Sequence, residues 1–326
     1  MKKKTIVVLY SDAKRKYFAS EEHYKTELEV FDRAKIIENH LVNLGYKALL
    51  LPGDYNSLIK LKKINPYLVL NLVDSVYGNE KLISLVPAVL QLSNIPYTGA
   101  GISGLSLNAS KFLTKTVLKQ SGIPVPKFQL FNSHKTRLDR SLNFPLIVKL
   151  NESHGSLEID QGAVVENEGK LKNRIKYLTS KYKQSVIAEE YIRGKEITVL
   201  YINSGKKIIL AEERIFFKKE KYPLYSYEAA WGEKEIYDCH PFKLNKVLKE
   251  NIVEAFEILQ FKDYARFEII FDKKGNYYFI DPNANPAFGP YGTTSGPFGY
   301  LLHMNNILFD DVLKDIINNA RLRFNK

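Results

Sequence analysis

The sequence predicts an open parallel α/β lobe followed by a larger antiparallel α+β region. In the first hundred residues, apolar runs of strand length alternate with segments of helical periodicity, and this alternation is typical of a parallel sheet. Beyond about residue 105, short apolar runs follow one another with few helices between them, which favours antiparallel pairing. The 326 residues, 45% hydrophobic and 26% charged, suffice for two or three compact lobes.

The first lobe contains three strand-like runs: TIVVLY, YKALLL and LVLNLV. A helix is predicted between the first two, because apolar residues recur there at steps of four and three, and Gly45 is placed to cap its end: Val30, Ala34, Ile37, Leu41 and Leu44. Helical periodicity returns from about Leu82 to Leu92. Asn71 and Asp74 stand at the carboxyl end of the third strand, where open α/β sheets bind ligands. Each is equally well interpreted as a turn cap.

The second region begins with a helix from about Asn108, which Gly122 follows. Five strand-like runs come next: PLIVKL, GAVVEN, SVIAEEYI, EITVLYIN and KIILAEE. Helices are predicted at about 170–181 and 244–259. YARFEIIF and YYFI then form a hairpin across DKKGN, whose glycine suits the turn, and the C-terminal segment is helical in pattern.

The chain carries 48 Lys and Arg against 36 Asp and Glu, a formal charge of +12. Scattered lysines indicate a solvated surface or an anionic ligand such as a nucleotide, whereas a nucleic-acid partner would favour a clustered basic tract. The single cysteine, Cys239, excludes an intramolecular disulfide framework. The apolar run 6–10 is too short for a signal peptide, and no run reaches the ~18 residues of a membrane span. We therefore expect a soluble, cytoplasmic protein without a membrane or nucleic-acid partner.

The hairpin carries the strongest chemical signal. Strand alternation places Arg266 and Glu268 on one face of the first strand, and Asp281 and Asn283 on one side of the second. Two carboxylates held close together repel each other unless a cation lies between them. Oxygen ligands of this kind suit Mg²⁺ shared with phosphate oxygens. Turn-capping acids beside a surface arginine remain the alternative interpretation.

Lysines and small residues upstream suggest an anion site. Lys149 closes the run PLIVKL, and Lys111 and Lys115 share one helix face. The loop SHGSLEID lets backbone N–H groups approach phosphate oxygens, although most such loops are plain turns. Glu189 and Glu196 flank a turn at Gly194, where they could accept hydrogen bonds from an adenine amino group and ribose hydroxyls, or simply be rim charges.

Several stretches, taken in order, resemble the ATP-grasp superfamily, specifically its D-alanine–D-alanine ligase-like branch. They are NLVDSVYG with IPYTGAG, SKFLTK ahead of GIPVPKF, PLIVKL with HGSLEI, VIAEEYIRGKEITV, YSYEAAW, RFEIIF and FIDPNANP. The resemblance covers about residues 65–290. It implies an N-terminal substrate lobe at 1–105, a small ATP-grasp subdomain at 106–185 and a C-terminal catalytic subdomain at 186–326.

The resemblance further implies an ATP-dependent carboxylate–amine ligase that works through an acyl phosphate. Its substrates would be a small carboxylate and an amine of the amino-acid or dipeptide class, and a homodimer is a reasonable expectation. It also implies roles for the motif residues at the nucleotide: Lys111 and Lys149 would hold the α and β phosphates, Ser156 would lie on the closing loop, and Glu189 and Glu196 would hold adenine and ribose, with the backbone of Tyr191 and Ile192 at the adenine edge. Two Mg²⁺ ions, with Mn²⁺ as an alternative, would be bound by Glu268, Asp281 and Asn283. Arg266 would lie beside the reacting carbonyl.

The chain departs from the family pattern at several positions. Ala230 stands where a lysine usually contacts the γ-phosphate; Lys218, Lys219 and Lys234 are the nearby substitutes. Glu158 replaces a usual glycine, and its charge could repel phosphate. Val73-Asp74 replaces a usual His-Gly pair, and only Glu21 and Glu22 are candidates for the acid that grips the substrate amino group. These departures argue against D-alanyl-D-alanine synthesis itself.

Two other functions remain open at this point. A catalytically weak ATP-grasp protein that binds nucleotide and regulates a partner is favoured by Ala230 and Glu158, but opposed by the complete metal trio. A basic nucleic-acid binder would need basic and aromatic residues clustered on one face, and the sequence has no such cluster.

Overall fold

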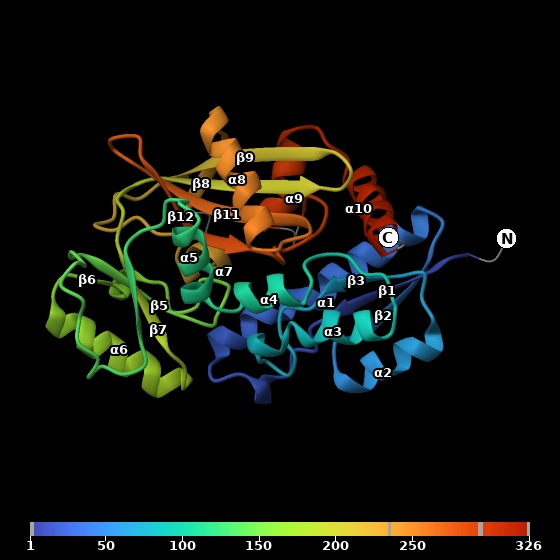
Figure 1. The fold of residues 1–326 in the computed structure, drawn as a ribbon, viewed down its shortest axis with the longest axis horizontal. Helices are drawn as coiled ribbons and strands as arrows, with labels where there is room; N and C mark the ends of the chain where they lie inside the picture. Colours follow the sequence, from blue (N-terminus) through green and yellow to red (C-terminus); the bar gives the residue numbers. More distant parts are fainter. Residues whose placement is uncertain (1–2, 234–235, 293–295, 325–326) are drawn as a thin grey trace.

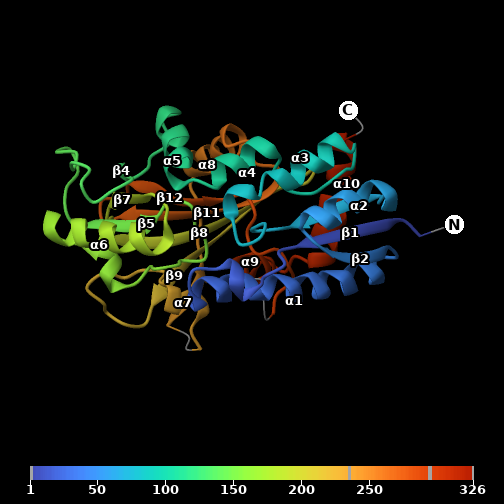
Figure 2. The same cartoon turned by 90° about the horizontal axis from the view of Figure 1, so that it is seen from below.

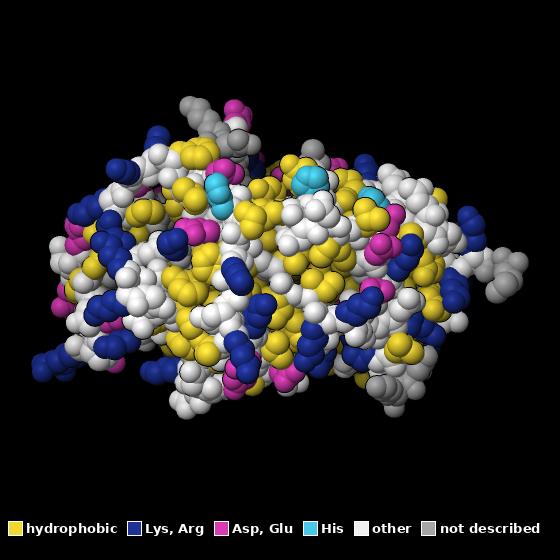
Figure 3. Space-filling view, turned by 90° about the horizontal axis from the view of Figure 1, so that it is seen from above, with side chains coloured by type: hydrophobic (Ala, Val, Ile, Leu, Met, Phe, Trp, Pro, Cys, Tyr) yellow, Lys and Arg dark blue, Asp and Glu magenta, His cyan; other side chains and the backbone are white. Residues whose placement is uncertain are grey.

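A computed structural model describes residues 3–233, 236–292 and 296–324. The predicted fold class is confirmed, because a parallel sheet at the N-terminus is followed by two antiparallel sheets. Figure 1 shows the parallel lobe at one end, the smaller antiparallel sheet at the other, and the larger antiparallel sheet between and above them. On the face seen in Figure 3, Lys and Arg side chains are dispersed among other residues. No helix in the described ranges is long and apolar enough to cross a membrane.

The parallel sheet has the order β2-β1-β3 and is covered on both faces. Odd and even positions of β1 therefore both face apolar helices: Val7 packs with α2 and α3, and Val8 with α1. Figure 2 shows α1 on one side of the strands and α2 and α3 on the other. The elements are β1 (Thr5–Tyr10), the 3₁₀ turn η1 (Arg15–Tyr17), α1 (Glu21–Asn43), β2 (Lys47–Pro52), α2 (Tyr55–Ile64), β3 (Leu68–Leu72), η2 (Glu80–Leu82) and α3 (Leu85–Leu92).

A four-stranded antiparallel sheet of order β4-β7-β5-β6 follows, and α6 packs against it. The predicted strand GAVVEN is only two residues long, because it ends where Asn167 caps the next helix by accepting a hydrogen bond from the Lys170 N–H. The elements are β4 (Phe128–Phe131), β5 (Leu146–Leu150), η3 (Gln161–Ala163), β6 (Val164–Val165), α6 (Glu168–Tyr182) and β7 (Val186–Glu190).

The largest sheet has the order β10-β9-β8-β11-β12 and is antiparallel throughout. One apolar core joins it to α4, α5 and α8. The helix predicted from about Asn108 is α5, which begins at Lys111 because Ser110 is extended and caps it by accepting from the Leu113 N–H. The short helix α4, which ends at Asn108, was not predicted. The elements are α4 (Ile102–Asn108), α5 (Lys111–Gln120), β8 (Gly194–Asn203), β9 (Lys207–Phe216), α7 (Tyr227–Trp231), β10 (Tyr237–Pro241), α8 (Lys246–Ile258), β11 (Asp263–Asp272) and β12 (Tyr277–Asn283).

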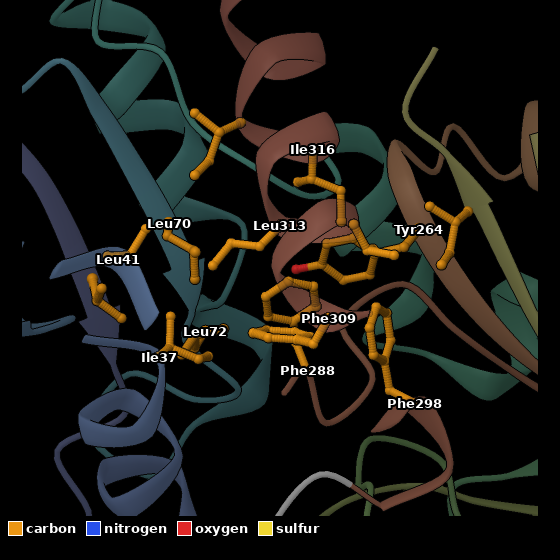
Figure 4. Packing of buried hydrophobic residues seen from close by; sticks show 14 of the residues in the cluster. Ile37, Leu41, Leu70, Leu72, Tyr264, Phe288, Phe298, Phe309, Leu313 and Ile316 are labelled. Atoms are coloured by element: carbon orange, nitrogen blue, oxygen red, sulfur yellow. The ribbon is translucent and has the colours of Figure 1, made fainter. Parts of the chain in front are cut away.

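The C-terminal helices tie the parallel lobe to the large sheet. α9 (Gly296–Met304) and α10 (Phe309–Phe324) share one apolar core with α1, β1 and β3. In Figure 4, Leu70 of the first lobe faces Leu313 and Ile37 lies beside Leu72, while Phe288 stacks on Tyr264 of β11. This shared core holds the carboxyl ends of the parallel strands close to the β11–β12 hairpin, and the candidate site lies between them.

Candidate functional site

The β11–β12 hairpin brings four predicted side chains together. Its register pairs Glu268 directly with Asp281, and Arg266 with Asn283, so alternation places all four on one face. The Arg266 Nε lies 3.0 Å from the Glu268 Oε1. Burial would raise the pKa of Asp281, but the charges of Lys111, Lys149 and Arg266 outweigh it and lower that pKa. Asp281 is therefore a carboxylate at neutral pH.

The two predicted phosphate lysines approach this hairpin from other elements. At the N-terminus of α5, the Lys111 Nζ donates to the Asp281 Oδ1 at 3.1 Å. On β5, the Lys149 Nζ donates to the Glu189 Oε2 at 3.2 Å. Lys115 is buried behind them, donates to the Ile280 carbonyl at 2.7 Å and lies 3.3 Å from the same Glu189 oxygen. Burial lowers the pKa of Lys115 to about 8. Because Lys115 contacts Glu189 and the Ile280 carbonyl, it supports the site from inside the fold.

The loop after β5 covers these side chains. Gly155, Ser156 and Glu158 all have positive φ, between 55° and 67°. The Glu158 carboxylate turns away from the lysines toward α6, where it accepts hydrogen bonds from Lys181 at 2.8 Å and Tyr182 at 2.8 Å. The expectation that its charge could repel a phosphate stays a prediction, and these hydrogen bonds argue against it because they hold the carboxylate against α6. Their hydrogen bonds also lower its pKa, although burial opposes them.

A cavity lies between the two antiparallel sheets, and we call it the inter-sheet cavity. Nine of the predicted site residues line it: Lys111, Lys149, Ser156, Glu189, Tyr191, Ile192, Glu196, Glu268 and Asp281. The Glu189 Oε1 is buried without a hydrogen-bond partner among the described residues, although Oε2 contacts two lysines. An acceptor left open at a cavity wall suits a ligand amino group.

Arg214 on β9 also lines the inter-sheet cavity, and the sequence did not single it out. Its Nη1 lies 3.1 Å from the Glu196 Oε2 and 3.6 Å from the Glu268 Oε2. This contact depends on the pairing of Arg214 with Glu196 across β8 and β9. β8 and β9 form a hairpin across the short turn 204–206, so the strand register that brings Arg214 opposite Glu196 was a signal that the sequence offered.

A second cavity, of about 210 Å³, lies between the parallel lobe and the hairpin, and we call it the interlobe cavity. It is lined by Arg266 and Asn283, the two predicted residues that do not line the inter-sheet cavity. The two cavities are adjacent, because both are lined by Lys111, Ser153, His154, Gly155, Ser156, Tyr225, Glu268 and Asp281.

Acidic side chains of the parallel lobe gather beside the interlobe cavity. Asp74 and Glu80 line it, and Glu27 of α1 lies fully buried nearby. The His154 Nδ1 lies 3.0 Å from the Glu80 Oε1, and its Nε2 lies 3.6 Å from the Glu27 Oε1. We call Glu27, Asp74 and Glu80 the acidic wall; Arg33 lies among the same acids.

The acidic wall shifts the titration of its own members. Burial raises the pKa of Glu27 to about 7 and also raises that of Asp74. Burial acts in the opposite direction on His154, but Glu80, Glu27 and Asp74 outweigh it and raise that pKa to about 10. His154 is therefore protonated at neutral pH, whereas Glu27 is only partly ionised there.

Glu27 could have been found from the sequence, but Glu21 and Glu22 were chosen instead. Glu27 precedes Val30 by three residues, so it extends the apolar stripe of α1 and must face inward. Neither Glu21 nor Glu22 lines the interlobe cavity: Glu21 pairs with Arg15, and Glu22 lines a separate surface pocket. Asn71 is a turn cap, as the alternative interpretation of this residue had it, because its side chain accepts a hydrogen bond from the Val73 N–H at 3.2 Å.

Ala230 lies on α7 and lines the interlobe cavity. Lys218 and Lys219 are exposed, and neither lines the two cavities. Lys234, the third substitute, lies outside the described residues. The helix that carries Ala230 is held onto the loop after β5, because the Trp231 Nε1 donates to the Gly155 carbonyl at 2.8 Å.

The donor set of the hairpin fits a hard divalent cation. Within the described ranges, no three His, Cys, Asp or Glu side chains form a metal cluster. The hairpin instead offers two opposed carboxylates, each now paired with a cationic side chain, and the amide oxygen of Asn283, which accepts from the Asn285 N–H at 2.8 Å. Mg²⁺ is commonly bound by one or two carboxylates together with substrate phosphates. The set therefore suits a metal that arrives with a polyphosphate.

Comparisons with known proteins agree with this geometry. Residues 117–318, more than half of the chain, match the family model described as D-ala D-ala ligase C-terminus. A D-alanine–D-alanine ligase of Francisella philomiragia is 25% identical over 328 residues, covering 98% of this chain and 100% of the relative. An uncharacterized protein of Sinorhizobium fredii, y4sG, is 28% identical over 264 residues, 77% of each chain.

Solved structures show the same fold. The D-alanine–D-alanine ligase of Bacillus anthracis complexed with ATP superposes with a TM-score of 0.72 at 18% identity, covering 100% of this chain and 99% of that one. Together with the family match, this likeness extends over both antiparallel sheets and the parallel lobe. The chain therefore belongs to the D-alanine–D-alanine ligase C-terminal family of ATP-grasp ligases.

Proposed function

We propose that this ligase uses ATP and Mg²⁺ to join a small carboxylate to an amine through an acyl phosphate. The observation that carries the proposal is the meeting of two phosphate lysines, two opposed carboxylates and one arginine where two cavities join. The inter-sheet cavity would hold the nucleotide, and the interlobe cavity would hold the substrates.

Within the inter-sheet cavity, each group of the nucleotide has a matching side chain. The Glu189 Oε1, which lacks a hydrogen-bond partner among the described residues, could accept from an adenine amino group, and Glu196 could accept from ribose hydroxyls. Lys111 and Lys149 would exchange their present partners, Asp281 and Glu189, for phosphate oxygens. Glu268, Asp281 and Asn283 would hold Mg²⁺, whose chemistry is to offset the charge that develops during phosphoryl transfer.

The interlobe cavity supports the second half of the reaction. Arg266 lies at the hairpin between the two cavities, where a carboxylate activated as an acyl phosphate would lie. An amine that attacks this carbonyl produces an oxyanion, and a fixed guanidinium stabilises it by roughly 3–4 kcal/mol. The acidic wall would hold a protonated amino group beside this cavity. Its three acids favour substrates of the amino-acid or dipeptide class.

ATP can enter the inter-sheet cavity only if the segments beside its opening, α7 and the loop after β5, move. The volume of this cavity is about 110 Å³, below the roughly 300 Å³ of the smallest usual ligand pockets. Trp231 and Gly155 hold α7 and the loop after β5 together through one hydrogen bond. We infer that this contact opens for ATP and closes again over the phosphates, with Ser156 on the closing loop.

A second candidate function rests on one observation. The described residues of the segment 225–231 over the cavities include no lysine or arginine, because Ala230 occupies the expected cation position. A protein that binds nucleotide but turns it over slowly would have this composition. Its two cavities would then serve regulation of a partner rather than ligation.

The deciding experiment is ADP release in the presence of Mg²⁺, screened against pooled amino acids and dipeptides, with mass spectrometry of the products. The ligase predicts release that rises with one pool, together with a product heavier than its substrates by one condensation. ATP binding without turnover in every pool supports the second candidate and contradicts ligation.

A further inference from the structure

Arg214 is held in one position on the floor of the inter-sheet cavity. Its side chain is 1% exposed, and its two terminal nitrogens contact different partners. Nη1 lies 3.1 Å from the Glu196 Oε2, and Nη2 donates to the Thr198 Oγ1 at 3.0 Å. Thr198 in turn donates to the Glu268 Oε2 at 2.8 Å. The planar guanidinium therefore links both carboxylates through one rigid fork.

Aromatic rings fix the guanidinium from the other side. The Tyr225 ring centroid lies 3.8 Å from the Arg214 Cζ, and the Tyr237 centroid lies 5.2 Å away. Such contacts restrain the rotamer as well as adding a favourable cation–π energy. Burial would lower the pKa of Arg214, but Glu268, Glu196 and the two tyrosines outweigh it and raise that pKa. The side chain is a permanent cation.

Arg214 lies between two carboxylates that have different proposed roles. Arg214 spans from Glu196, the candidate ribose carboxylate, to Glu268, a candidate metal carboxylate, so a bound polyphosphate would run above it. Lys111 and Lys149 belong to other elements of the cavity, α5 and β5. Tyr225, which stacks on Arg214, begins the segment 225–231, whose described residues carry no lysine or arginine. On this side of the cavity, the charge comes from the sheet rather than from the covering segment.

We propose that Arg214 is a positioning residue of the nucleotide site that sets the spacing of Glu196 and Glu268 and offsets polyphosphate charge from below, in place of a cation on the covering segment. The inference rests on the proposed function, because it assumes that the inter-sheet cavity binds ATP. It adds a residue, and a source of charge, to the site.

The test is calorimetric binding of MgATP and of adenosine to the wild type and to Arg214→Met. We expect MgATP affinity to fall about tenfold or more, as for loss of a hydrogen bond to a charged group, while adenosine affinity changes by about threefold at most. Lys195→Met is the matched control. Lys195 lies next to Glu196 on β8, is 63% exposed and pairs with Glu213, so its loss leaves both affinities unchanged.

A rescue variant separates charge from mere support of the fold. Ala230→Lys in the Arg214→Met background places a cation on the covering segment. We expect it to recover at least about threefold of the lost MgATP affinity without changing adenosine affinity. If Arg214→Met does not fold, Arg214→Met/Glu196→Gln is compared with Glu196→Gln alone, because this pair removes the buried charge together with its partner.

Three outcomes would overturn the inference. Equal losses for MgATP and adenosine mean that Arg214 only holds the ribose carboxylate. Undiminished MgATP binding by folded Arg214→Met means that it plays no part in nucleotide binding. A wild type that does not bind MgATP contradicts the proposed function, and this inference fails with it. The second outcome, in a wild type that binds MgATP, leaves the proposed function standing.

Discussion

The two cavities balance their charges differently. At the inter-sheet cavity each lysine already has an acidic partner, Lys111 with Asp281 at 3.1 Å and Lys149 with Glu189 at 3.2 Å. At the acidic wall, three acids surround one histidine and one arginine, and neither Glu27 oxygen has a hydrogen-bond partner among the described residues. We call the first region the compensated end, because each lysine is paired with an acid, and we expect the lysines to exchange these partners for ligand atoms when the ligand binds. In the second region, burial keeps a proton on part of the acids instead, and a cationic ligand would favour their ionised form.

The pKa shifts of the carboxyl groups differ between the two regions in the same way. Neighbouring cations lower the pKa of Asp281 despite its burial, whereas burial raises the pKa of Glu27 to about 7. Burial alone therefore does not decide the charge of either carboxylate; the number of nearby cations does. We infer that the nucleotide end is built for ATP whatever the substrate, and that the acidic wall awaits a cationic group of the substrate.

The largest effect is expected for Asp281→Ala at the compensated end. It removes one of the two opposed carboxylates and leaves Lys111 without its partner. Mg²⁺-dependent ADP release should fall by about 100-fold or more, because the charge that develops at the phosphates is no longer offset. Circular dichroism should show an unchanged fold, and undiminished turnover would count against the metal assignment.

Asp74→Asn tests the acidic wall with a substitution of nearly equal volume. The amide oxygen can still accept the hydrogen bond from the Asn285 Nδ2, now 2.7 Å long, so packing is kept and only the charge is lost. We expect the KM of the amino substrate to rise about 30-fold and the KM of ATP to stay constant. Asp12→Asn, in the same lobe and paired with Lys14, is the control and should change neither. An equal rise in both KM values would show that the wall is not specific to the substrate.

Glu27 predicts a pH dependence of stability. Its pKa of about 7 in the folded protein lies above the usual glutamate pKa of 4.5, so the folded state holds the proton more tightly. This contribution is fully present below pH 4.5 and is lost as the pH rises through 7. Relative to Glu27→Gln, the wild type should lose about 2 kcal/mol of unfolding free energy between pH 5 and pH 7. Chemical denaturation at both pH values measures this, and a constant difference would show that Glu27 is not desolvated.

Glu158→Gly is expected to have the smallest effect. Glycine suits the φ of 61°, but the hydrogen bonds from Lys181 and Tyr182 are lost. We expect a net destabilisation of about 1 kcal/mol and faster proteolysis of the loop, with no gain in MgATP affinity. Glu168→Gln, which breaks an exposed pair with Lys172 on α6, should change stability by less than about 0.5 kcal/mol. A marked gain in MgATP affinity for Glu158→Gly would mean that its charge does reach the phosphates.

Sequence patterns predicted the compensated end better than the acidic wall, for a physical reason. Glu268 and Asp281 lie in one hairpin, where strand alternation and a short turn determine which side chains meet. The contacts of His154 with Glu80 and Glu27 join three separate segments and depend on how a loop folds against α1. No periodicity along the chain records such contacts.

Two details of the fold show the same limit. The predicted start of α5 at about Asn108 is three residues early, because helical periodicity continues across Ser110, which is extended and acts as the cap. The direction of Glu158 depends on a positive φ, which is unusual for glutamate and cannot be foreseen from residue type. Glu27 is different, since its place in the apolar stripe of α1 was visible in the sequence.

Calorimetric titration of MgATP into the wild type, Asp281→Ala and Asp74→Asn tests the separation of the two ends most directly. The account predicts that Asp74→Asn binds MgATP as tightly as the wild type, and that Asp281→Ala binds it at least about tenfold more weakly. Equal affinity for Asp281→Ala and the wild type, or an equal loss in both variants, would contradict it.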